Sequence, residues 1–199
     1  APTVLVLDDA FTRQASEEIR DAVAAAAAHL RAAGFTVRRA ALFDEIEPLN
    51  ETHNRMVARE FADVHRAWVE LHRDRYSDRS LALIEKGLTV SDAELEEARA
   101  GRLELRARFE RLLESEHAEL ILSPSAAGAA PAGIDATGSP LLNLPFTYAG
   151  LPTMTLPVAT NAAGLPLGLQ VAARFGADEE LVAHAASIET VVSFGVART

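Results

Sequence analysis

Two of the six histidines, His65 and His72, lie seven residues apart in a stretch with helical periodicity, with Glu60 and Asp63 nearby. Imidazole and carboxylate groups bind metals, so this is the first place to look for chemistry. A zinc site on one helix needs ligands three or four residues apart, as in the H-E-x-x-H motif. Seven residues span two turns, which is too wide for one ion. We therefore predict a solvated helix face here and no metal site.

Serine catalysis needs an activated hydroxyl, and the G-x-S-x-G nucleophile motif is absent from the sequence. Ser125 and Ser139 lie in a loop where they could contact a ligand, but no base is visible near either. Lys86 is the only lysine, and in "LIEKGL" it precedes Gly87. That pattern predicts a helix C-terminus with a solvated amine, whereas a lysine base must be desolvated or placed beside another cation.

Other catalytic and cofactor-binding patterns are also missing. The segment "GLPLG" lacks the glycine spacing and the lysine of a phosphate-binding loop, and its proline removes a backbone N–H donor. The acidic pairs Asp8-Asp9 and Glu96-Glu97 are adjacent, so the two side chains of each pair point apart. There is no cysteine, which excludes disulfides and thiolate nucleophiles. From the residues alone we predict no catalytic set, no metal and no cofactor.

Composition describes an acidic globular chain of 199 residues, with 49% hydrophobic residues and a net charge of −10. This length fits a single domain over residues 1–199. An acidic surface repels phosphate backbones and anionic lipids, which argues against nucleic-acid and membrane partners. No apolar run approaches the roughly 20 residues of a membrane span, and no basic signal-peptide region opens the sequence. We expect a cytoplasmic protein.

Hydrophobic periodicity predicts an α/β fold that begins with a βαβ unit. Residues 3–7 form a buried strand, residues 16–33 form a helix that Gly34 ends, and residues 35–42 form a second strand parallel to the first. The apolar positions of the helix are Ile19, Val23, Ala26, Ala27 and Leu30.

A helical region follows the βαβ unit. Residues 50–75 form a long helix, residues 80–86 a short one closed by Gly87, and "SDAE" from Ser91 a capping box that opens a third helix ending near Glu116. The predicted inward positions of the long helix are Met56, Val57, Phe61, Val64, Trp68 and Leu71. Those of the third helix are Leu95, Leu103, Leu105, Phe109, Leu112 and Leu113.

The last third of the chain returns to strands. A buried strand over residues 119–122 leads into residues 124–140, a loop rich in Gly, Ala and Pro whose length indicates a functional or disordered segment. A short helical turn near Leu141 comes next. Strands at 153–159 and 167–173 and a final helix at 178–192 complete the chain.

The segment from Asn143 to Glu189 resembles the closing part of the amidase signature family of serine hydrolases. The family pattern is G-x-P, a strand ending in Pro, G-L-P-x-G-x-Q, a further strand, an acidic residue and a final helix. In this chain the matching positions are Gly150–Pro152, Pro157, Gly164–Gln170, Asp178 and Glu189. The loop at Ser123-Pro124 and Pro131 and the opening βαβ unit are also similar to the family. Ala173 stands where the family usually has Gly.

This resemblance implies a fold and a division of roles. The fold would be part of the family's α/β/α sandwich, a mixed sheet flanked by helices, with loops that wall the substrate channel. Candidate substrate-binding residues are Ser125, Thr137, Phe146 and Thr147. The family's catalytic residues are a nucleophilic Ser, a second Ser in a cis peptide and a Lys base, in a Gly-Ser-rich segment N-terminal to everything in this chain. The chain has no such segment, so we predict no amidase activity for it alone.

Two functional hypotheses follow. In the first, the chain is the C-terminal portion of an amidase-signature hydrolase that acts on a small carboxamide, and its uncovered sheet edges lead to homo-oligomers or to association with the missing half. In the second, the chain is a stand-alone amidase-like remnant that serves as a binding or scaffold protein. A small α/β ligand sensor is a weaker third hypothesis, because no anion-binding loop is present.

Overall fold

The structure is a computed structural model, and it describes residues 2–192. The chain divides into two compact units. We call residues 1–46 and 105–199 the sheet unit and residues 47–104 the helical unit. The length-based prediction of a single domain does not distinguish these two units, and each is described by itself below.

The sheet unit contains a five-stranded mixed sheet with the strand order β2-β1-β3-β5-β4. Its strands are β1 (Thr3–Leu7), β2 (Thr36–Ala40), β3 (Leu120–Pro124), β4 (Thr153–Thr160) and β5 (Pro166–Ala172). β1 is parallel to β2 and β3, whereas β5 is antiparallel to β3 and β4. The predicted α/β class and parallel βαβ unit are therefore confirmed.

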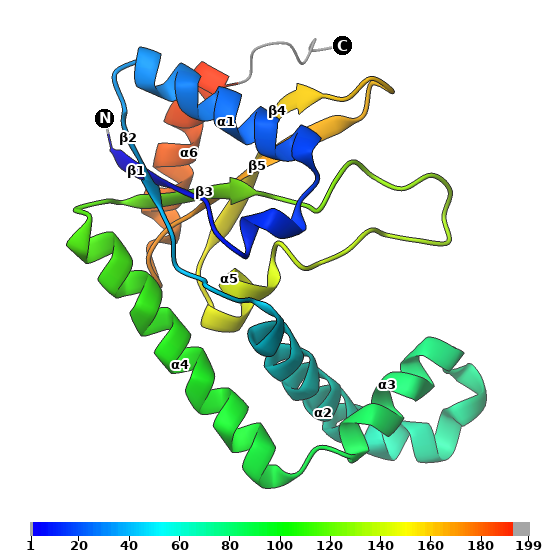
Figure 1. The fold of residues 1–199 in the computed structure, drawn as a ribbon. Helices are drawn as coiled ribbons and strands as arrows, with labels where there is room; N and C mark the ends of the chain where they lie inside the picture. The colour runs from blue at the N-terminus through cyan, green and yellow to red at the C-terminus, as the bar shows by residue number, and fades with distance from the viewer. Residues whose placement is uncertain (1, 193–199) are drawn as a thin grey trace. The chain divides into compact units, whose positions relative to one another are not determined.

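Two helices cover one face of this sheet, α1 (Glu17–Ala32) and α6 (Asp178–Val192). In Figure 1, α1 lies above β1 and β3, and α6 lies next to α1. Alternate residues of the central strands point to these helices because side chains alternate between the faces of a strand. The buried strand positions of this core include Val4, Leu120, Leu122, Leu169 and Val171. All five predicted apolar positions of α1 are also buried.

The opposite face of the sheet carries an aromatic core. It is covered by α5 (Leu144–Ala149) and by residues 105–115 of α4 (Asp92–Ser115). Phe146 stacks on Phe109 with ring centroids 5.3 Å apart and meets Phe11 edge-on at 5.7 Å. Phe43 adds contacts with Phe11 and Phe109 at 5.8 and 5.9 Å. These four rings fix the positions of the loop after β1, the segment after β2, and α5.

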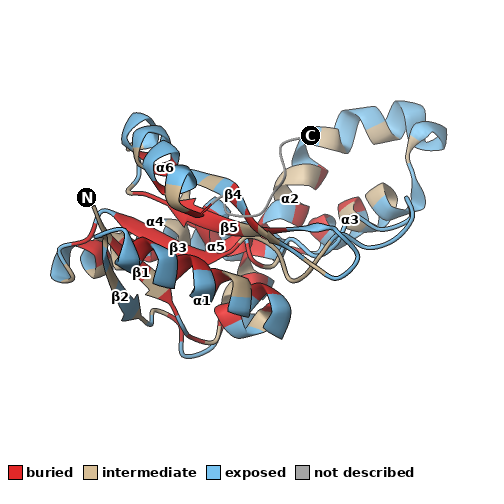
Figure 2. Ribbon diagram, turned by 90° about the horizontal axis from the view of Figure 1, so that it is seen from above, coloured by how far each residue is buried: buried red, intermediate tan, exposed pale blue. Residues whose placement is uncertain are grey.

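The helical unit consists of α2 (Glu47–His72), α3 (Asp78–Leu88), the first part of α4 and a short 3-10 turn, η2 (Arg73–Arg75). The predicted capping box at Ser91 is confirmed, because Ser91 N donates to Glu94 Oε2 at 2.9 Å and Glu94 N donates to Ser91 Oγ at 3.3 Å. Figure 2 shows that the outer surfaces of α2 and α3 are largely exposed.

The predicted inward face of α2 is largely wrong. Val64, Trp68 and Leu71 are 65%, 56% and 75% exposed, and Val57 is exposed as well. Met56 is buried as predicted, and the other buried positions of α2 are Asn50, His53, Ala58 and Ala62. Leu103, predicted to point inward from α4, is also exposed. The sequence does contain an apolar stripe on α2, but the helix packs through a neighbouring face that includes the small residues Ala58 and Ala62.

Gly87 does not end its helix as predicted. The helix continues to Leu88, and Thr89 caps it by donating through both its backbone N and its Oγ1 to the Lys86 carbonyl. Gly87 is buried, and a Cβ built on it would overlap the backbone carbonyl of Ala58 in α2. Glycine is required here because α2 and α3 approach closely, which is a packing role rather than a capping role.

Candidate functional site

A buried polar network lies on the α5 face of the sheet, between β3 and β5. Gln170 Nε2 donates to Ser123 Oγ at 3.2 Å and to the Leu142 carbonyl at 3.0 Å. Both side chains are almost fully buried. A buried amide without partners would cost free energy, so these bonds fix the segment that leads into α5 against the sheet. The Gln of the G-L-P-x-G-x-Q motif is therefore a positioning residue for the neighbouring loop.

Ser125 lies next to this network, at the start of the long loop. Its backbone N donates to the Gly168 carbonyl at 3.1 Å, and its own carbonyl accepts from Asn143 Nδ2 at 3.5 Å. Gly168 has no space for a side chain, because Ser125 Oγ and Thr155 Cγ2 occupy the position that a Cβ would take. The second glycine of "GLPLG" thus serves close packing on Ser125, a role that the sequence motif did not indicate.

The structure distributes the four predicted substrate-binding residues over three environments. Ser125 is half-buried and adjoins Asn143, the residue that precedes α5. Thr147 is exposed on α5, whereas Phe146 is 1% exposed and belongs to the aromatic core. Thr137 is exposed in the loop. The structure therefore brings Ser125 next to the start of α5 and places Thr137 in the exposed loop.

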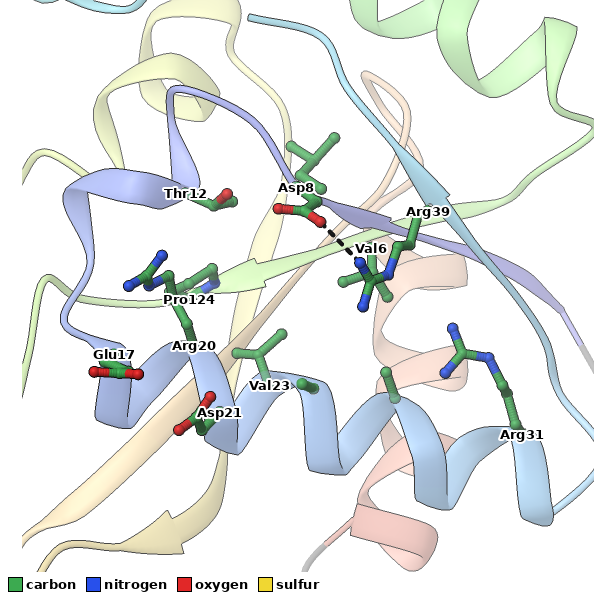
Figure 3. Close-up of a pocket in the computed structure, with 13 residues that line it drawn as sticks. Val6, Asp8, Thr12, Glu17, Arg20, Asp21, Val23, Arg31, Arg39 and Pro124 are labelled. Atoms are coloured by element: carbon green, nitrogen blue, oxygen red, sulfur yellow. Dashed lines mark hydrogen bonds and ion pairs between the residues drawn. The ribbon is translucent and has the colours of Figure 1, made fainter.

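A hollow of about 290 Å³ lies between α1 and the carboxyl ends of the parallel strands, and we call it the α1 hollow. Its walls come from the end of β1, the residues that follow it, α1, the end of β2 and the end of β3. Figure 3 shows Arg39 of β2 reaching Asp8, with an N–O distance of 3.0 Å. The sequence did not predict this hollow, because its charged residues come from three separate segments.

The adjacent carboxylates Asp8 and Asp9 have different environments, as their alternation predicts. Asp8 is exposed at the α1 hollow. Asp9 is buried and accepts four backbone N–H bonds: Phe11 and Thr12 donate to Oδ1, and Leu42 and Phe43 donate to Oδ2. Asp9 thereby ties the end of β1 to the segment after β2. The D-x-x-T spacing of Asp9 and Thr12 was a signal for this turn, since Thr12 Oγ1 also accepts from Asp9 N.

The remaining candidates for chemistry lie in the helical unit. Lys86 is exposed in the last turn of α3, as predicted. His65 Nδ1 is 2.7 Å from Tyr76 Oη, and its ring packs on Phe61. Burial and the nearby Arg102 guanidinium lower the pKa of His53, while Glu60 acts in the opposite direction. Among the described residues, no three His, Asp or Glu side chains are grouped as metal ligands.

Comparison with known proteins gives the family. The family model described as Amidase matches residues 3–182. The chain belongs to the amidase family. A solved structure titled "Crystal structure of amidase" superposes with a TM-score of 0.84 at 26% identity, and the match covers 96% of this chain and 46% of that one. The structure of 6-aminohexanoate cyclic dimer hydrolase complexed with substrate has the same fold, with a TM-score of 0.81 at 20% identity, and the match covers 98% of this chain and 46% of that one.

Sequence relatives in the amidase family match shorter stretches. Indoleacetamide hydrolase of Allorhizobium ampelinum is 29% identical over 125 residues, which cover 56% of this chain and 27% of the relative. A glutamyl-tRNA(Gln) amidotransferase chain of Granulibacter bethesdensis is 38% identical over 76 residues, 36% of this chain and 15% of the relative. The chain thus spans less than half the length of these relatives. No helix among residues 2–192 has the length and apolar character to cross a membrane.

Proposed function

We propose that this chain is the C-terminal portion of an amidase-signature hydrolase, and that it forms an active enzyme only together with an N-terminal portion that supplies the Ser-Ser-Lys residues. One observation carries the proposal: the structural match covers 96% of this chain and only 46% of the amidase to which it is similar. The reaction would hydrolyse a small-molecule carboxamide to a carboxylic acid and ammonia or an amine.

The position of Lys86 supports the inactivity of the chain alone. A lysine that takes a proton from serine must be desolvated or lie beside another cation. Lys86 is exposed at the end of α3 in the helical unit, and it is the only lysine of the sequence. The amine needed for the serine relay must therefore come from another polypeptide segment.

The β4 edge supports association with that segment. Within the described residues β4 pairs with β5 alone, so its other edge has free backbone groups. Thr155 is exposed and lies opposite Gln170, so both point to the α5 face. We propose that the N-terminal portion pairs along β4 and covers this face, where Ser125, Thr137 and Thr147 contribute to the substrate wall. Phe146 contributes through packing.

The test is complementation. The purified chain is assayed against a panel of simple amides alone, and again with the N-terminal half of the amidase whose structure it matches. We expect turnover only in the mixture. Thr155→Lys on β4 should weaken complementation strongly, whereas Thr36→Lys on the exposed face of β2 is the matched control. Turnover by the chain alone would overturn the proposal. A stable homo-oligomer that excludes the added half would favour the scaffold hypothesis.

A further inference from the structure

The α1 hollow lies at a point in the sheet where α/β proteins bind small molecules. β1 and β3 are parallel neighbours, and their carboxyl ends meet at the same edge. The helix after β1, α1, packs on one face of the sheet, whereas the helix after β3, α5, packs on the other. Where connections leave neighbouring strands in opposite directions, a crevice opens between the strand ends, and ligands bind there.

The charges at this crevice are available to a ligand. Arg20 points from α1 toward the end of β3 (Figure 3), and it has no ion-pair partner among residues 2–192. Asp8 lies at the end of β1 and uses Oδ2 for Arg39. No described residue donates to Asp8 Oδ1. A free guanidinium and a free carboxylate oxygen therefore face one small hollow.

The other charges of the hollow limit the ligand to one end of it. Arg31 is eleven residues beyond Arg20 on α1, roughly 16 Å along the helix axis, and its Nε donates to the Val37 carbonyl at 3.4 Å. Glu17 and Asp21 flank Arg20 on the same helix. Glu17 and Asp21 offset the positive charges of Arg20 and Arg31. The hollow therefore does not favour a ligand that carries several negative charges. A ligand with one charge of each sign fits it best.

We propose that the α1 hollow binds a small amino carboxylic acid in its zwitterionic form. Arg20 donates to the ligand carboxylate, which a guanidinium recognises with two parallel N–H bonds. Asp8 Oδ1 accepts from the ligand ammonium. Val6, Val23 and Pro124 supply apolar wall for the carbon chain between the two groups. The volume of about 290 Å³ lies at the small end of ligand sites, which suits a ligand of a few carbon atoms.

The experiment compares three probes that differ by one charged group. Binding of 4-aminobutanoate, butanoate and butylamine to the full chain is measured by two-dimensional NMR titration, which also locates the site through the shifted amides. We expect 4-aminobutanoate to shift amides of residues 6–12 and 17–24 and to bind about tenfold or more tightly than either single-charge probe. Equal binding of the three probes, or shifts confined to other regions, would overturn the proposal.

Matched variants assign the two ends of the ligand. Arg20→Gln should reduce the affinity for 4-aminobutanoate to that of butylamine, and Asp8→Asn should reduce it to that of butanoate. Arg111→Gln removes an exposed arginine outside the hollow and should change nothing. Both test residues are exposed, so the variants should retain the wild-type spectrum elsewhere. Wild-type affinity in Arg20→Gln would contradict the assignment, and the result does not depend on amide hydrolysis.

Discussion

Helices α1 and α2 carry similar amphipathic patterns, yet only the apolar side of α1 is buried. In α1, all the predicted apolar positions pack into the core of the sheet unit, with Leu30 fully buried. In α2, four of the six predicted positions are exposed, and Leu71 at the end of the stripe is 75% exposed. Periodicity identifies which side of a helix is apolar. It does not identify which side another element covers.

The partners of the two helices explain the difference. α1 lies on a sheet, whose regular row of apolar side chains matches a broad apolar stripe. α2 packs on α3 at a position where Gly87 lies against Ala58 and Ala62. Small residues allow two helix backbones to approach closely, and they define the contact face even where larger apolar side chains lie beside it. The predicted stripe of α2 followed its larger apolar side chains and left out Ala58 and Ala62, so most of it lies on a side of the helix that nothing covers in the described residues.

The largest expected effect comes from comparing one aromatic residue in each unit. Phe146→Ala should destabilise the sheet unit by about 3–5 kcal/mol, because it removes a ring from the buried aromatic core. Trp68→Ala should cost about 1 kcal/mol or less in the helical unit, because the indole is 56% exposed. Urea denaturation followed by circular dichroism measures both. A smaller loss for Phe146→Ala than for Trp68→Ala would contradict the assignment of these two environments.

A matched pair of leucines makes the same comparison within α1 and α2. Leu30→Ala should lower the free energy of unfolding by about 2–5 kcal/mol, through lost burial and the cavity left behind. Leu71→Ala should change it by about 0.5 kcal/mol or less. If the Leu71 variant were as destabilised as the Leu30 variant, the stripe of α2 would be covered in solution. Chemical denaturation of both variants, with the oligomeric state measured in parallel, distinguishes these outcomes.

Gly87→Ala tests whether small residues define the contact between α2 and α3. In an exposed helix interior, this change would stabilise by about 1 kcal/mol through helix propensity. Here we expect a loss of about 1–3 kcal/mol, because the new Cβ overlaps the Ala58 carbonyl. The fluorescence of Trp68, the only tryptophan, reports unfolding of the helical unit. Gly128→Ala, which meets only Ser16 Oγ at 3.8 Å, is the control. A stabilised Gly87 variant would show that the helices do not touch here.

The smallest effect expected is the pH dependence of the helical unit. Burial, with help from Arg102, lowers the pKa of His53 in the folded state, so the unfolded chain binds the proton more readily. Above about pH 6.5, the ordinary pKa of histidine, His53 is neutral in both states and does not lower the free energy of unfolding. As the pH falls below that value, protonation of the unfolded chain lowers the free energy of unfolding. His53→Gln should flatten the pH dependence of the Trp68-detected urea midpoint between about pH 7 and about pH 5, relative to the control His72→Gln. An unchanged slope would contradict this assignment.

Much of the sheet unit could be predicted from the residue pattern. The βαβ opening, the buried strand before Ser123 and the two strands β4 and β5 all lie close to their predicted positions, although their antiparallel pairing was not predicted. The family also follows from local motifs such as Gly164–Gln170. These features depend on short-range chemistry: alternation in strands, spacing in helices and turn residues at fixed offsets. Each of these signals lies within a few neighbouring residues, so it can be read without knowledge of the tertiary structure.

The candidate sites depended on contacts between distant segments. Asp8 and Asp9 are identical in type and adjacent, yet Asp9 is buried by amides from two segments and Asp8 faces a hollow with Arg20. Gly87 was predicted to end its helix, and no packing role was predicted for Gly168, but each is required where another backbone or side chain comes too close for a Cβ. The sequence by itself determines which chemical groups are present and which sides of its helices and strands are apolar. Which groups meet, and which apolar sides are covered, is a property of the folded chain, because packing joins residues that no local pattern relates.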